Sequence, residues 1–179
     1  MPPRPLFVAA TRQHTGKTTV SLALMSGLLK RYNKVGFSKP VGQQHVAVRE
    51  GGTETRVDKD SQLIKDYFEL DHISYHDTSP VLVPRAYTKQ YIDGEISSAE
   101  QAAKMTDAFK RVSTSSDFCV LEGTGHVGVG SIIGMSNAGV AAHLGADMLL
   151  VANGGIGSAF DDLEINRIMC EEQVCSAFR

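Results

Sequence analysis

Hydrophobic residues occur in short continuous runs that alternate with longer amphipathic stretches. The continuous runs lack polar alternation, which is typical of strands buried on both faces of a parallel sheet. We predict four strands, in residues 5–10, 34–41, 117–125 and 147–158. Apolar positions at helical spacing predict helices over residues 17–32, 58–70, 97–115, 136–145 and 161–173. The pattern therefore predicts an α/β fold with a doubly wound, mostly parallel sheet.

Two segments do not fit this alternation of strands and helices. Residues 42–57 are polar and contain glycine, so we expect a loop, and residues 72–95 contain two prolines and are expected to be irregular. The helix over 97–115 has a plausible cap, Ser97 or Ser98 followed by Glu100. The length of 179 residues indicates one domain, 1–179.

The composition of the chain limits which binding partners and which cellular compartment we expect. The formal net charge of −2 gives no basic surface for nucleic acid. No apolar run is long enough for a membrane span or a signal peptide. The 3 cysteines form no C-x-x-C pair, which favours a reducing compartment. We expect a cytoplasmic protein, with an organelle stroma or matrix left open.

The segment "ATRQHTGKTT" separates the first predicted strand from the first predicted helix. Gly16, Lys17 and Thr18 match the end of the phosphate-loop pattern G-x-x-x-x-G-K-[ST], but Thr11 stands where the first glycine is expected. A helix N-terminus attracts phosphate through free N–H groups and a partial positive charge. Lys17 adds a charge for the β- and γ-phosphates, and Thr18 can ligate Mg²⁺. The alternative is an ordinary helix cap with a solvated lysine.

Acidic and basic residues also lie at the carboxyl ends of other strands, where parallel sheets bind ligands. Glu122 ends the third strand and could hold Mg²⁺ or simply cap the next turn. Asp58 and Asp60 are both candidates for a second metal ligand, and either could instead cap the following helix. Lys39 ends the second strand and could stabilise a transferring phosphoryl group, or be a solvated lysine.

Six stretches occur in the order found in one family. They are "TRQHTGKTTVSLAL", "KPVGQ", "DKDSQLIK", "TSP", "VLEGTGHVGVGS" and "LLVANGGIG". Together they resemble dethiobiotin synthetase-like P-loop proteins, a group that includes cobyrinic acid a,c-diamide synthases and the N-terminal domain of long phosphate acetyltransferases. The segment "GMSNAGVAAHLGA" is most similar to the phosphotransacetylase-associated subgroup.

The resemblance implies a set of site residues for Mg²⁺ and ATP. In the family the loop reads G-T-x-x-x-x-G-K-T, so Thr11 matches a subtype. The implied nucleotide-binding residues are Thr11, His14, Thr15, Gly16, Lys17, Thr18 and Thr19. The implied metal ligands are Thr18, Asp60 and Glu122, with Asp60 favoured over Asp58 by the helix that follows it. Lys17 and Lys39 would act in catalysis by neutralising the γ-phosphate.

The resemblance leaves three functions open. A strand that reads the nucleotide base in the family would begin near residue 179, so we expect a C-terminally truncated domain. This favours a nucleotide-binding or regulatory module over an ATP-dependent synthetase that phosphorylates a carboxylate or carbamate. The synthetase would need a small carboxylate or diamine substrate. The third alternative is a ParA/MinD-like switch ATPase, with Arg12 in place of an early lysine. Family members are often homodimers, and residues 72–95 could form the contact surface.

Overall fold

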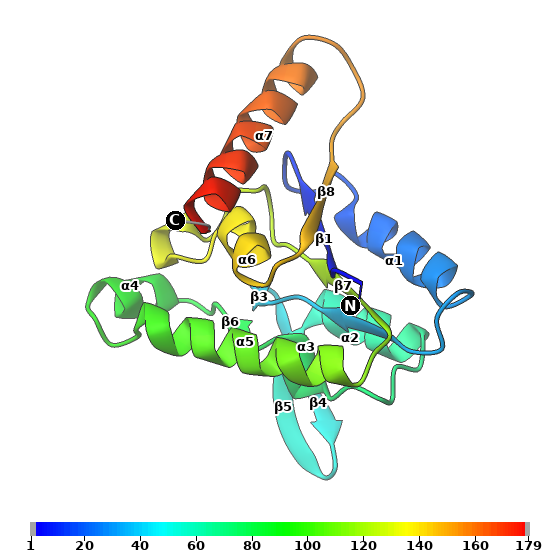
Figure 1. The fold of residues 1–179 in the computed structure, drawn as a ribbon. Helices are drawn as coiled ribbons and strands as arrows, with labels where there is room; N and C mark the ends of the chain where they lie inside the picture. The colour runs from blue at the N-terminus through cyan, green and yellow to red at the C-terminus, as the bar shows by residue number, and fades with distance from the viewer. Residues whose placement is uncertain (1–2, 178–179) are drawn as a thin grey trace.

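A parallel sheet forms the centre of the molecule. The structure is a computed structural model that describes residues 3–177. Its main sheet has four strands in the order β2-β7-β1-β8, all parallel, which confirms the predicted fold class (Figure 1). The strands are β1 (Leu6–Ala10), β2 (Val35–Ser38), β7 (Phe118–Glu122) and β8 (Asp147–Val151).

Helices cover both faces of this sheet. They are α1 (Lys17–Leu28), α2 (Lys59–Tyr67), α3 (Tyr75–Thr78), α4 (Tyr87–Ile92), α5 (Ser98–Thr114), α6 (Asn137–His143) and α7 (Ser158–Ala177), with a short 3₁₀ helix, η1 (Ser131–Ile133). Successive residues of β1 belong to different cores, because strand side chains alternate between faces. Phe7 packs with the α6 side and Val8 with the α1 side. The apolar runs are continuous for this reason.

Residues 42–57 correct a prediction. They are not a loop, since β4 (His45–Glu50) and β5 (Thr53–Asp58) form an antiparallel hairpin that projects from the body of the molecule (Figure 1). The turn residues Gly51 and Gly52 have φ of 58° and 83°. Two consecutive positive φ values are what a tight hairpin turn requires, and glycine adopts them without strain. The adjacent glycines are a sequence signal for a hairpin turn, but the polar composition of the segment led to the prediction of a loop.

The segment predicted to be irregular also contains regular structure. Residues 72–95 include α3, α4 and the two-residue strand β6 (Val81–Leu82), which pairs in parallel with β3 (Val41–Gly42). Pro40 separates β3 from β2, as expected for a residue without an N–H donor. The β3–β6 pair holds the chain just beyond Lys39 at the edge of the main sheet.

Side chains cap the helices that border this edge. Ser97 and Glu100 form the predicted capping box at the start of α5, and Asp58 caps α2 by accepting from the N–H of Asp60 at 3.0 Å. No helix within residues 3–177 has the length and hydropathy needed to cross a membrane.

Candidate phosphate-binding site

The carboxyl ends of β1, β2 and β7 meet at a cavity of about 280 Å³. Gly16 precedes α1 with φ of 99°, and no side chain caps this helix, so its first N–H groups are available to a ligand. The cavity is lined by Gln13, His14, Gly16, Lys17, Thr18, Thr19, Lys39, Gln43, Gln44, Asp58, Lys59, Asp60, Glu122, Gly123, Thr124 and Gly125. Thr11 and Thr15 do not line it: Thr11 is buried, and the Thr15 hydroxyl donates to the Arg12 carbonyl at 2.8 Å.

Two buried lysines give the cavity its positive charge. Burial lowers the pKa of Lys17 below its usual range despite the opposing charge of Glu122. Burial also acts to lower the pKa of Lys39, but Asp58, Glu122 and Asp60 outweigh it, so the pKa of Lys39 is raised. Lys17, at the start of α1, and Lys39, at the end of β2, therefore face the same cavity, and the surrounding carboxylates keep Lys39 charged.

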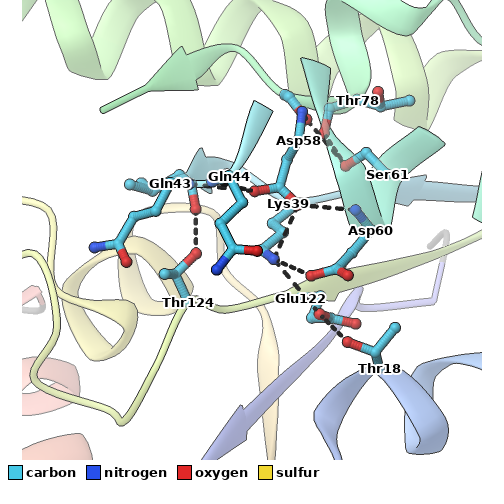
Figure 2. Close-up of polar contacts among 12 residues, drawn as sticks. Thr18, Lys39, Gln43, Gln44, Asp58, Asp60, Ser61, Thr78, Glu122 and Thr124 are labelled. Carbon is cyan, nitrogen blue, oxygen red and sulfur yellow. Dashed lines mark hydrogen bonds and ion pairs between the residues drawn. The ribbon is translucent and has the colours of Figure 1, made fainter. Parts of the chain in front are cut away.

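Three carboxylates surround the Lys39 ammonium (Figure 2). Its Nζ lies 3.0 Å from Asp58 Oδ1 and 3.8 Å from Glu122 Oε1, and it donates to Asp60 Oδ2. The side chains of Lys39, Asp58 and Glu122 are 8%, 1% and 1% exposed. Lys17 and Lys59 also line the cavity, so three ammonium groups and three carboxylates meet there and their formal charges balance.

Asp58 and Asp60, which sequence could not separate, have different surroundings. Asp58 Oδ1 accepts from the Asp60 N–H, and Asp58 Oδ2 accepts from the N–H groups of Gln43 and Gln44 at 3.2 and 3.4 Å. Its carboxylate is thus occupied in joining the base of the hairpin to α2 and Lys39. Asp60 is 18% exposed, and its carboxylate contacts Lys39 through Oδ2. The helix-cap role accordingly falls to Asp58.

The donor set around Glu122 suits a magnesium ion. Glu122 Oε1 accepts from the Thr18 hydroxyl at 3.0 Å, whereas Oε2 is buried and has no well-formed hydrogen bond in the described residues, although the Ser21 hydroxyl lies near the carboxylate. Burial raises the pKa of Glu122, and Lys39 opposes this effect only in part. No group of three His, Cys, Asp or Glu side chains in residues 3–177 could hold a metal unaided. Mg²⁺ bound beside phosphates needs only one or two carboxylates, so Thr18, Asp60 and Glu122 fit it.

A second cavity of about 200 Å³ adjoins the first. Gln43 and Thr124 line both, and the remaining walls are largely aliphatic: Val41, Val83, Thr88, Val129, Gly130, Ile132, Ile133 and Asn137. Asn137 fixes one wall, because its side chain accepts from the Thr124 N–H at 3.1 Å and donates to the carbonyls of Thr124 and His126.

Sequence reasoning did not select several residues of this region, among them Gln43, Gln44, Thr124 and Asn166. Gln43 and Gln44 end the segment "KPVGQQ" that begins at Lys39, so their position shortly after a strand-end lysine was a usable signal. Thr124 stands two residues after Glu122, at the end of the next strand at the same edge of the sheet. Asn166 lies in α7, far along the chain, and hydrogen-bonds to the carbonyl of Thr11. Nothing in the sequence pattern marks Asn166.

Comparison with known proteins agrees with this architecture. The sequence profile of the family described as "AAA domain" matches residues 4–177. Two proteins named phosphate acetyltransferase are similar: that of Nitratidesulfovibrio vulgaris is 32% identical over 153 residues, covering 83% of this chain and 20% of the relative. That of Nitrosomonas europaea is 30% identical over 150 residues, covering 82% and 19%. The chain thus spans about one fifth of the length of these relatives. It belongs to the AAA-domain family of P-loop proteins, with its similarity to phosphate acetyltransferases confined to one domain-sized part of them.

Proposed function

We propose that this protein is a Mg²⁺–ATP-binding domain that serves as a nucleotide-binding or regulatory module and is related to the N-terminal domains of phosphate acetyltransferases. The observation that carries the proposal is the convergence of an uncapped helix N-terminus, two buried lysines and a hydroxyl–carboxylate pair on one cavity. Free N–H groups and lysines suit a polyphosphate, whereas Thr18, Asp60 and Glu122 suit its metal.

Each group has a distinct part in the proposed complex. The N–H groups of Gly16 to Thr19 and the Lys17 ammonium would bind phosphate oxygens. Mg²⁺, when bound, neutralises charge on the β- and γ-phosphates. Lys39 would then lie between the metal ligands and the terminal phosphate, held by the Asp58 carboxylate. His14 and Thr19 line the same cavity and complete the set of contacts.

Calorimetry tests this proposal directly. Wild-type protein titrated with ATP in the presence of Mg²⁺ should release heat of binding, and Lys17→Ala should weaken that binding at least tenfold, because a charge-assisted contact to phosphate is lost. ADP and GTP, titrated alongside, establish preference for phosphate number and base. Equal affinity of wild type and Lys17→Ala, or no binding by either, contradicts the proposal.

The second cavity favours one alternative, an ATP-dependent synthetase that phosphorylates a small carboxylate. Because Gln43 and Thr124 line both cavities, a small acid bound in the second cavity would lie next to the phosphate site. A synthetase should release ADP only when a suitable acid is present, whereas a regulatory module should bind ATP without this requirement. Arg12 pairs with Asp162 and does not line the cavity, so no contact favours the switch-ATPase alternative.

A further inference from the structure

Asn166 joins three segments that are far apart in the sequence. Its Nδ2 donates to the Thr11 carbonyl at 3.3 Å and to the Asp162 carbonyl at 2.7 Å. Its Oδ1 accepts from the Val127 N–H at 3.2 Å. One amide on α7 therefore contacts both the start of the phosphate loop and the loop that follows β7.

Burial increases the energetic importance of these hydrogen bonds. Asn166 is 8% exposed, Thr11 is 5% exposed and Val127 is fully buried. A buried carbonyl or N–H without a partner is costly, and asparagine is a poor residue for the interior of a helix. Outside its own helix, Asn166 satisfies the Thr11 carbonyl and the Val127 N–H, and these two hydrogen bonds fix α7 relative to both loops.

The phosphate loop is attached to α7 at its first two residues. The Thr11 N–H donates to the Val151 carbonyl of β8 at 3.0 Å, and the Thr11 carbonyl accepts from Asn166. Both backbone groups of Thr11 are therefore hydrogen-bonded. The next residue, Arg12, forms an ion pair with Asp162 of α7. Residues 16–19 of the loop face the cavity instead. A ligand that orders 16–19 consequently acts on a loop whose other end is held by α7.

The loop that follows β7 connects the same helix to another part of the cavity lining. Gly123, Thr124 and Gly125 line the phosphate cavity, and Val127, two residues on, donates to Asn166. The two loops that supply the cavity lining are therefore both hydrogen-bonded to one side chain, at Thr11 and at Val127. These hydrogen bonds form a contiguous route between the two loops and α7.

We infer that Asn166, together with the Arg12–Asp162 pair, is a positioning element that couples the phosphate cavity to α7, so that nucleotide binding stabilises this helix. The inference rests on the proposed nucleotide binding and adds the contacts through which binding would affect α7. Nucleotide affinity and the opening of α7 must then be linked, because a coupling free energy acts equally in both directions. Helix α7 is therefore the part of the domain whose stability responds to nucleotide.

Hydrogen–deuterium exchange with and without Mg²⁺–ATP tests the coupling in the full chain. In wild type, nucleotide should slow amide exchange in the phosphate loop and also in residues 158–170 of α7. In Asn166→Leu, the slowing in the phosphate loop should remain while that in α7 is lost, and the Kd for ATP should rise about 5- to 20-fold. A residue with only a structural role would not separate these two responses.

Exposed variants keep the test valid if Asn166→Leu does not fold. Arg12→Gln removes an ion pair whose arginine side chain is 57% exposed, and it should reduce the α7 response. Arg167→Gln is the matched control, because Arg167 pairs with Glu164 and Glu171 on the exposed surface of α7, and this variant should leave the response unchanged.

An α7 response retained in every folded variant overturns the coupling. Wild type that binds ATP without any α7 response also overturns the coupling but leaves the proposed function intact, whereas absence of ATP binding overturns both.

Discussion

The replacement Lys39→Met removes the single ammonium that three carboxylates contact. Methionine preserves most of the side-chain volume, so the loss is chiefly electrostatic. At an effective dielectric constant of about 20, one unit charge at 3.0 Å contributes about 5.5 kcal/mol and one at 3.8 Å about 4.4 kcal/mol. Part of this attraction is offset, because folding no longer has to remove the lysine ammonium from water. The measured net cost of breaking a buried ion pair is about 3–5 kcal/mol.

The variant should therefore lose about 3–5 kcal/mol of the free energy of unfolding, a large share of the total for a domain of this size. Mg²⁺ should restore more stability to Lys39→Met than to wild type, because Asp60 and Glu122 then lack their internal cation. Urea denaturation, followed by far-ultraviolet circular dichroism with and without millimolar Mg²⁺, measures both quantities.

A matched control is the variant Lys65→Met. Lys65 is also buried, but its ammonium donates to the Leu70 carbonyl at 2.9 Å and lies over the Tyr75 ring. Its loss should destabilise the protein without creating a dependence on Mg²⁺. A cost for Lys39→Met below about 1 kcal/mol, the value of an exposed ion pair, would refute the reasoning. So would equal Mg²⁺ effects on the two variants.

Three other changes have definite expected outcomes. A Cβ at Gly123 would lie 2.7 Å from Asn137 Oδ1, so Gly123→Ala should cost about 1–3 kcal/mol in urea denaturation and weaken ATP binding. Burial acts to raise the pKa of Asp77, but Arg111 outweighs it and the pKa is lowered. Since the folded pKa lies below the unfolded one, the cost of Asp77→Asn should be about 1 kcal/mol at neutral pH and should vanish as pH falls below about 4. Burial raises the pKa of Cys119 to about 12, so a maleimide should label this thiol only after unfolding.

Local patterns in the sequence were sufficient for the main sheet. Continuous apolar runs identified β1, β2, β7 and β8 because a parallel strand covered on both faces has no polar side. The strand-end rule then collected Lys17, Lys39 and Glu122 at one edge, and these three residues line one cavity. The search for continuous apolar runs could not find the β4–β5 hairpin, because its strands are largely polar and its sequence signal is the Gly51–Gly52 turn.

The sequence alone determined that a P-loop lies between a buried strand and a helix, and which charged residues surround it. Only the tertiary structure decided how those charges are used. It assigned the helix cap to Asp58, whose carboxylate accepts from the Asp60 N–H and from the N–H groups of Gln43 and Gln44 between β3 and β4, and it left Asp60 the more exposed of the two carboxylates. It also placed Asn166 against Thr11, which lies 155 residues away in the chain. Such contacts depend on how the chain folds back on itself, and a local pattern of residue types contains no information about that.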